Sequence, residues 1–138
     1  MKRTLFLSIL IVFFTISFMS VVGCNNQRST KDEYILQEKC GKSCEEYFRK
    51  TYGGLTDQQY TYDYKNHYNK NMNKCFILLD SRSPYSGNRK DLRDINENKQ
   101  YGSFWRSSKG VITFCRVSKK ECESEEEWDS LVKPYMEE

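Results

Sequence analysis

Residues 75–79 read Cys-Phe-Ile-Leu-Leu, the most apolar run of the chain after its first 24 residues. Alternate side chains of a strand point to opposite sides of a sheet, so a short run without polar residues is typical of a strand buried on both faces. We therefore predict a central strand over residues 74–79. The rest of the chain is expected to pack against it.

Further strands are predicted on both sides of this run, because tyrosines or aliphatic residues alternate there with polar residues. The predicted strands are residues 59–68, 91–95, 100–106 and 111–117. A polar stretch at residues 96–99 separates two of them and predicts a hairpin. Residues 82–90, which contain Pro84 and Gly87, are predicted to form a surface loop.

A helix is predicted before the strands and another after them. Thr30–Glu33 and Ser124–Glu127 both have the sequence pattern of a capping box, which satisfies free backbone N–H groups at a helix start. The first helix is predicted over residues 31–52, and Gly53-Gly54 would stop it. Pro134 is expected to end or bend the second helix.

This order of elements predicts an α+β fold. We expect an antiparallel β-meander with an N-terminal and a C-terminal helix packed on one of its faces. The chain has six cysteines. If Cys24 carries lipid, five remain, so at most two disulfides form and one thiol is left over. The candidates are Cys40, Cys44, Cys75, Cys115 and Cys122, and the sequence does not choose among their pairings.

The first 24 residues have the pattern of a bacterial lipoprotein signal. Lys2-Arg3 forms the positive flank, an apolar run extends from Leu5 to Val22, and Val21–Cys24 matches the lipobox. A thiol is needed there because the diacylglyceryl group is joined to sulfur. A retained anchor helix with a buried cysteine is the alternative interpretation.

The signal predicts three parts of the chain: a cleaved peptide at residues 1–23, lipidated Cys24 with a polar tether at residues 24–30, and one domain at residues 31–138. Two or more acyl chains, such as palmitate, would hold that domain at a membrane stably. We therefore expect a protein anchored in the cell envelope. Asn25 favours the outer membrane if the organism is Gram-negative.

The charge of the chain is unevenly distributed. Residues 65–120 have 13 basic and 4 acidic side chains, whereas residues 121–138 have 1 basic and 8 acidic. We expect the acidic C-terminal segment to dock on the basic middle, the alternative being a basic face turned to anionic lipid or polymer. The near balance of charge and the export signal both argue against nucleic acid as a partner.

The sequence has no recognisable catalytic motif. His67 is the only histidine, so it would have to serve any Ser-His or Cys-His arrangement, and no motif surrounds it. The Cys40-x3-Cys44 spacing is not a Cys-x-x-Cys redox motif. The acidic cluster at residues 91–97 lacks the order of a calcium loop and is interpreted as a solvated hairpin. We expect no enzymatic activity, no metal and no cofactor.

Three sequence blocks carry a resemblance to known proteins. They are His67–Leu79 (HYNK followed by NKCFILL), Asn96–Phe104 (NENKQYGSF) and Glu127–Met136 (EWDSLVKPYM). The chain resembles a group of small bacterial lipoproteins and secreted proteins without an assigned activity. The resemblance implies a single exported domain. It implies no ligand and no site residues.

The function that we expect is therefore a non-enzymatic binding or structural module. Its partner would be an envelope or extracellular protein or polymer, and Tyr101, Phe104 and Trp105 are the candidate contact surface. One alternative is an inhibitor of a cell-wall hydrolase such as lysozyme, a basic target that the acidic C-terminal segment could bind. Another is a thiol-redox protein that uses Cys40 and Cys44.

Overall fold

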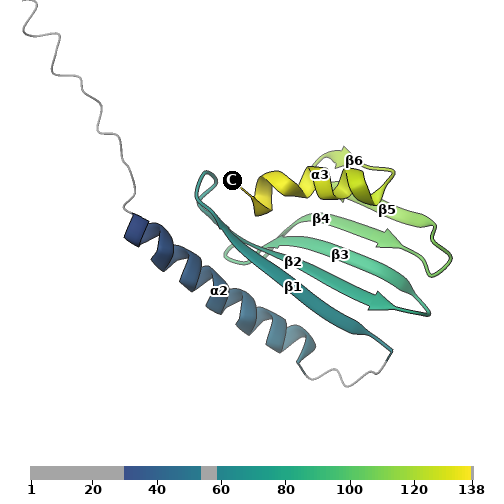
Figure 1. The fold of residues 1–138 in the computed structure, drawn as a ribbon, viewed down its shortest axis with the longest axis horizontal. Coiled ribbons are helices and arrows are strands. Elements are labelled where there is room, and N and C mark those ends of the chain that lie inside the picture. The colour runs from purple at the N-terminus through teal and green to yellow at the C-terminus, as the bar shows by residue number, and fades with distance from the viewer. Residues whose placement is uncertain (1–29, 54–58, 138) are drawn as a thin grey trace, which may run out of the picture.

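The computed structural model describes residues 30–53 and 59–137, and these contain two helices and a six-stranded sheet (Figure 1). The elements are α2 (Thr30–Tyr52), β1 (Thr61–Asn69), β2 (Lys74–Ser83), β3 (Gly87–Asp94), β4 (Lys99–Arg106), β5 (Ile112–Val117), β6 (Lys120–Glu121) and α3 (Glu125–Met136). The predicted signal peptide, Cys24, the tether up to residue 29 and Gly54 lie outside the described residues. Each strand pairs antiparallel with the next along the chain, so the predicted meander is confirmed.

The prediction of a strand buried on both faces is also confirmed. Phe76 and Ile77 are neighbours in β2 and point to opposite faces, and both are fully buried. β2 pairs with β1 on one side and with β3 on the other. The apolar run therefore forms the part of the sheet where the two cores meet.

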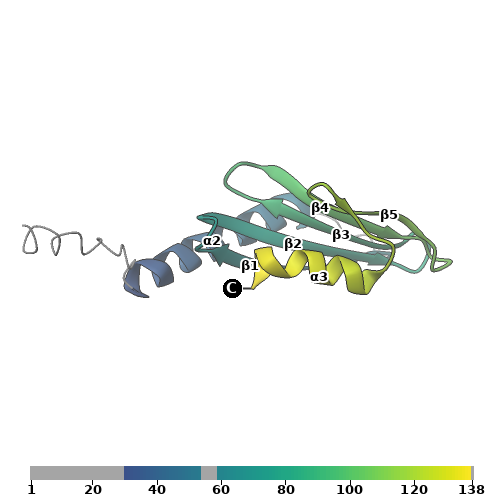
Figure 2. The same cartoon turned by 90° about the horizontal axis from the view of Figure 1, so that it is seen from above.

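The two helices lie on opposite faces of the sheet, not on one face as predicted (Figure 2). Cys75, Ile77 and Leu79 pack with α2, whereas Phe76 and Leu78 belong to the core under α3. The physical reason is the apolar run itself. A strand that is apolar on both faces needs cover on both, and each helix provides one cover.

The core under α3 is built around Trp128, which is fully buried against Phe76, Leu92 and Phe104. Gly102 in β4 makes room for it. A Cβ at Gly102 would lie 2.9 Å from the Trp128 ring, closer than real Cβ contacts allow. This close approach is why β4 has no side chain at that position.

The core under α2 includes a disulfide. Cys40 of α2 is bonded to Cys75 of β2, with the two Cα atoms 5.4 Å apart. A second disulfide, Cys115–Cys122, closes the β5–β6 end of the sheet. Together with the buried free thiol of Cys44, these bonds confirm the prediction of two disulfides and one leftover cysteine. The class, a disulfide-stabilised α+β domain, is confirmed.

Two predicted boundaries differ from the structure. The loop predicted at residues 82–90 is much shorter, because β2 continues to Ser83 and β3 begins at Gly87. Ser83 Oγ accepts from the backbone N–H groups of Tyr85 and Ser86 and closes a tight turn. Gly87 has a φ of +99°, and a Cβ there would collide with the carbonyl of Arg106, so only glycine fits.

α3 begins after the predicted cap residue Ser124 and continues past Pro134. Its predicted capping box is present in part: Ser124 Oγ accepts from the backbone N–H of Glu127 at 3.1 Å, whereas the Glu127 carboxylate accepts from the backbone N–H of Glu123 at 2.8 Å. Pro134 does not end the helix, which continues to Met136. A proline this close to the C-terminus removes only one helical hydrogen bond. Asn69 Nδ2 donates to the Pro134 carbonyl at 3.0 Å and ties this end of α3 to the end of β1.

The acidic C-terminal segment docks on the basic middle of the chain, as the charge pattern suggested. Glu125 accepts from Lys90 and from Arg106, each at 2.7 Å, and Asp129 lies 3.1 Å from Lys90. Burial lowers the pKa of Lys90, but its hydrogen bonds to Glu125 and Asp129 outweigh that effect, so its pKa is raised overall. These pairs fix the orientation of α3 on β3 and β4.

Candidate binding groove

α2 covers only the β1–β2 half of its face of the sheet, and a groove opens over the other half. The groove has a volume of about 470 Å³. Aromatic side chains from α2 and the start of β1 form one wall, and side chains of β2, β3 and β4 form the floor and the far side. The residues that matter here are Tyr47, Tyr52, Tyr60, Tyr62, Arg89, Asp91, Arg93 and Trp105.

The tyrosine wall follows from the alternation that predicted β1. Tyr62 and Tyr64 point to the same face as Leu79, the face that α2 covers. Tyr62 stacks on Tyr52 of α2, with ring centroids 4.6 Å apart, and Tyr60 stacks on Tyr62 at 5.9 Å. The Tyr60 hydroxyl accepts from Ser86 Oγ at 3.2 Å, which holds the ring over the β2–β3 turn. The wall is thus preorganised.

The floor contains one satisfied carboxylate. Asp91 accepts from Arg89 Nε at 2.8 Å, from Ser103 Oγ at 2.7 Å and from Gln100 Nε2 at 3.0 Å. Its side chain is only 13% exposed. A carboxylate with three donors has little remaining capacity to act as a general base, so its role here is to hold neighbouring side chains in place.

The floor also contains a guanidinium without a carboxylate. Arg93 donates through Nη1 to Asn98 Oδ1 at 2.8 Å and lies 5.9 Å from the ring centroid of Tyr47. Its Nε is buried and has no hydrogen-bond partner. Within residues 30–53 and 59–137, Arg93 is in no ion pair, so the groove holds an unmatched positive charge and an unused donor.

An exposed aromatic pair begins at the far side of the groove, where Trp105 lines the groove and Phe114 is its neighbour on β5. Trp105 of β4 is 48% exposed and lies opposite Phe114 of β5, which is 43% exposed. The Arg116 guanidinium lies 5.5 Å from the Phe114 ring centroid. Aromatic rings this exposed beside arginines have the composition that is enriched at the centres of protein interfaces.

The three aromatic residues predicted as a contact surface do not lie together. Trp105 alone lines the groove. Phe104 is fully buried under α3, and Tyr101 is half-buried and packs edge-on against Phe76 and Tyr135. Phe104 and Trp105 are consecutive in β4, so their side chains point to opposite faces. Tyr101 would share the face of Trp105 in a regular strand, but the register shift between Leu92 and Arg93 lies at this point and its ring packs on the face of Phe76. The sequence reasoning missed Tyr47, Tyr52, Arg89 and Arg93, which only the fold brings to one place.

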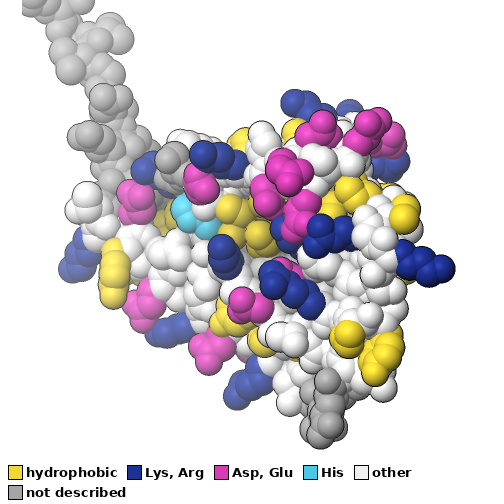
Figure 3. Space-filling view, turned by 45° about the vertical axis from the view of Figure 1, so that its right-hand side comes forward, with side chains coloured by type: hydrophobic (Ala, Val, Ile, Leu, Met, Phe, Trp, Pro, Cys, Tyr) yellow, Lys and Arg dark blue, Asp and Glu magenta, His cyan; other side chains and the backbone are white. Residues whose placement is uncertain are grey.

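A larger cavity, of about 590 Å³, lies on the other face between α3 and β1. Its charged side chains are mostly occupied with one another: Asp80 with Arg82 at 2.6 Å and Lys133 with Glu137 at 3.4 Å, in addition to the Lys90 pairs. Figure 3 shows a face of the molecule on which basic and acidic side chains are interspersed. We favour the smaller groove as the candidate site, because Trp105 is exposed there and Arg93 is in no ion pair with another described residue.

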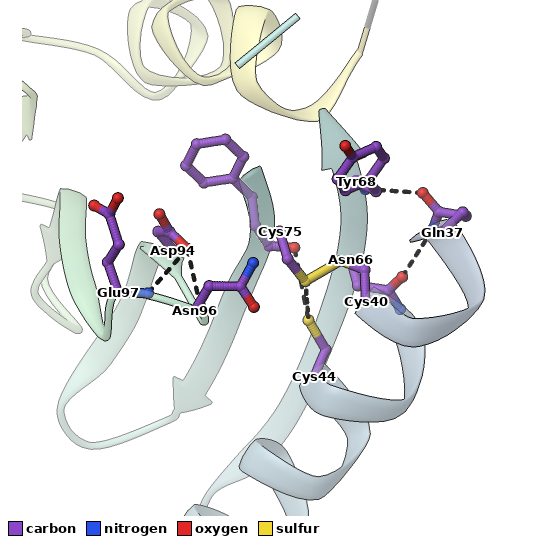
Figure 4. The surroundings of a disulfide bond; sticks show 10 residues. Gln37, Cys40, Cys44, Asn66, Tyr68, Cys75, Asp94, Asn96 and Glu97 are labelled. Carbon is purple, nitrogen blue, oxygen red and sulfur yellow. Dashed lines mark hydrogen bonds between the residues drawn. A yellow bond between two sulfur atoms is a disulfide. The ribbon is translucent and has the colours of Figure 1, made fainter. Parts of the chain in front are cut away.

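Three cysteines meet beside the groove, at the contact of α2 with β2 (Figure 4). Cys40 is bonded to Cys75, and the Cys44 Sγ lies 3.6 Å from the Cys75 Sγ. Burial raises the pKa of the Cys44 thiol to about 12. Because Cys40 is already bonded to Cys75, Cys40 and Cys44 do not form a disulfide with each other. The three sulfurs lie within 4.8 Å of one another, but two of them would have to be reduced before they could hold a soft metal ion.

The acidic cluster that was interpreted as a solvated hairpin is partly buried. Asp94 is fully buried and accepts from the backbone N–H of Asn96 at 2.9 Å (Figure 4). It also pairs with Lys74 at 2.8 Å. Hydrogen bonds to Asp94 and Glu97 raise the pKa of Lys74. The cluster closes the β3–β4 turn. His67 lies outside the groove, opposite Phe76 in the β1–β2 pair.

Comparison of the chain with protein-family models, curated proteins and solved structures gave no match. In the described ranges, 30–53 and 59–137, neither helix has the length and apolar character needed to cross a bilayer.

Proposed function

We propose that this protein is a lipid-anchored bacterial envelope protein that acts as a non-enzymatic binding module, with the aromatic groove as its binding site. The observation that carries the proposal is the groove itself: exposed aromatic rings and an unmatched guanidinium gathered over the half of the sheet that α2 leaves uncovered. Internal packing accounts for the other large aromatic residues under α3.

The anchor is supported by the sequence before Thr30. Residues 25–30 could span only about 20 Å when fully extended. With Cys24 lipidated, the domain would sit close to its membrane and meet partners that lie at or near that surface. An anchor of two or more acyl chains would make this location permanent.

The ligand that we propose is a segment of another protein that presents an acidic side chain. Tyr and Trp rings give a large contact area at small entropic cost, and the guanidinium of Arg93, which is in no ion pair with another described residue, offers its charge to a carboxylate. Arg89, held by Asp91, adds a second guanidinium on the same strand. An anionic envelope polymer is the competing ligand.

The test uses the full anchored chain in detergent micelles or membranes. A photo-crosslinking residue replaces Ser81, which lines the groove, and in a matched chain it replaces Lys65 on the other face. The partner recovered from the Ser81 position is then purified, and its affinity is measured against Trp105→Ala and Arg93→Gln. Tyr34→Ala serves as the control, since Tyr34 is 71% exposed on α2 and lies away from the groove.

Affinity is expected to fall about tenfold or more for both groove variants and to stay unchanged for Tyr34→Ala. Equal affinity for all four proteins would contradict the groove as the site. Binding to purified cell-wall polymer with no protein partner would contradict the proposed ligand.

The alternative functions have less support. An inhibitor of lysozyme would use the acidic charge of the C-terminal segment, and two of those acids, Glu125 and Asp129, are paired with this chain's own basic groups. A redox protein would need a reactive thiol, whereas Cys44 is buried and its pKa is raised. Unchanged lysozyme activity in the presence of excess protein would eliminate the inhibitor function.

A further inference from the structure

α2 presents two cysteines to one cysteine of β2. Cys40 and Cys44 are four residues apart, so they lie on the same face of the helix about 6 Å apart along its axis. Cys75 is bonded to the first, and its Sγ lies 3.6 Å from the Sγ of the second. All three side chains are at least 97% buried. Figure 4 shows the free thiol aimed at the bond.

We propose that the Cys40–Cys75 disulfide exchanges with Cys44, so that the protein has a second disulfide isomer in which Cys44 is bonded to Cys75 and Cys40 is the free thiol. The proposal does not depend on the function of the groove. It makes residues 40, 44 and 75 a thiol–disulfide exchange site within the α2–β2 contact.

The exchange is balanced without an oxidant or a reductant. Cys44 loses its proton, and its thiolate attacks the Sγ of Cys75. The new bond joins the sulfurs of Cys44 and Cys75 while the bond from Cys75 to Cys40 breaks. The electron pair of that bond leaves on the Cys40 sulfur, which takes up a proton. The number of thiols and disulfides is the same before and after.

Two features control when the exchange occurs. The short contact between the sulfurs of Cys44 and Cys75 provides the nucleophile and its target. Burial disfavours the thiolate, so at neutral pH the attacking form is rare while α2 stays packed. Exchange is therefore slow in the closed structure, and it is accelerated by alkaline pH or by local opening of α2.

The isomer changes how α2 is held. Cys44 lies closer along the helix to Tyr47 and Tyr52, which line the groove. Bonding Cys44 in place of Cys40 moves the fixed point of the helix one turn toward these rings. If the groove is the binding site, this couples the state of the disulfide to the shape of one wall.

The first measurement uses the unmodified chain. It is held at pH 10 in mild urea, quenched in acid, and labelled with a thiol reagent active at low pH, and the labelled cysteine is located by peptide mapping. We expect label on Cys40 in a fraction of molecules, with a matching Cys44–Cys75 peptide. The yield should not depend on protein concentration, since the step is intramolecular. Label confined to Cys44 would overturn the proposal.

The second measurement uses Cys40→Ser and Cys44→Ser. We expect Cys40→Ser to fold with a Cys44–Cys75 bond, whereas Cys44→Ser keeps the native bond and yields no labelled cysteine under the same treatment. A folded Cys40→Ser protein with both remaining thiols reduced, under conditions in which Cys115–Cys122 is formed, would overturn the proposal. If Cys40→Ser does not fold, the mapping of the unmodified chain decides.

Discussion

Removing the charge of Glu125 should loosen α3 from the sheet. Its carboxylate is the hub of the docking network, with one oxygen 2.7 Å from Lys90 and the other 2.7 Å from Arg106. The side chains of Lys90 and Glu125 are only 12% and 25% exposed, whereas Arg106 is 40% exposed. Glu125→Gln keeps the size of the side chain and removes the charge.

The expected cost can be worked out pair by pair. A hydrogen bond to a charged and partly buried group contributes about 1.5–3 kcal/mol, and an exposed ion pair contributes about 0–1 kcal/mol. The Lys90 pair belongs nearer the first range and the Arg106 pair nearer the second. Because Asp129 still pairs with Lys90 and glutamine keeps one acceptor, we expect a loss of about 2 kcal/mol, or about 8 °C in Tm for a domain of this size.

The effect of Glu125→Gln on stability should also depend on pH. The pKa of Lys90 is raised in the folded protein, so the stability that its pairs contribute is fully present below the usual lysine pKa. That stability is lost as the pH rises through the folded value. The difference between the unmodified protein and Glu125→Gln should therefore be constant near pH 7 and shrink above about pH 10.

The assay is urea unfolding followed by circular dichroism at low and high salt, with Glu126→Gln as the matched control. Glu126 lies in the same turn of α3 and is exposed, and among the described residues it forms no ion pair. We expect the control to stay within about 0.5 kcal/mol of the unmodified protein. Equal losses of stability for both variants would refute the docking mechanism. So would a loss for Glu125→Gln that disappears at high salt, because salt screens exposed ion pairs and not partly buried ones.

Three further predictions concern the two cores. Gly102→Ala should lower the free energy of unfolding by about 1–3 kcal/mol through overpacking. Gly41→Ala should raise it by about 0.5–1 kcal/mol, because a Cβ there meets nothing closer than 3.7 Å. Thermal melts compare the two variants, and a change of Tm in the same direction for both would contradict the packing argument. Lys74→Met should cost about 3–5 kcal/mol in urea unfolding, because it leaves buried Asp94 without its cation; a loss under 1 kcal/mol would show that Asp94 does not depend on it. Burial raises the pKa of the Cys44 thiol to about 12, so this thiol should resist alkylation at pH 8. For the same reason the free energy of unfolding should fall by up to about 1.4 kcal/mol per pH unit from pH 9 to 12. Cys44→Ala should lack this pH dependence.

Both helices and five of the six strands could be predicted because each has a local signal. The two-residue strand β6 has no such signal and was not predicted. The apolar run at residues 75–79 marks a strand buried on both faces, and the capping box at Ser124 marks the start of α3. The same run also contained the information that the prediction overlooked. Phe76 and Ile77 each require cover, so two helices on one face would have left one of them exposed.

The groove could not be predicted from local signals. Tyr52 and Trp105 are far apart in sequence and meet only through the sheet register, and Arg89 fell within a predicted loop. Pairing Cys75 with Cys40 instead of Cys44 depends on a placement of α2 to within one turn. Periodicity fixes the face of a helix but not its position along a strand.

The Cys40–Cys75 bond also determines how the molecule would respond to mechanical tension. A pull applied to the chain before Cys40 passes through the disulfide directly into β2, the most deeply buried strand, and bypasses residues 41–74. The second half of α2, the tyrosine wall and all of β1 lie in this bypassed loop. Tension between the N-terminal end and a partner held by the β3 and β4 side of the groove would therefore be carried by β2 and its neighbours, and residues 41–74 would not be stretched.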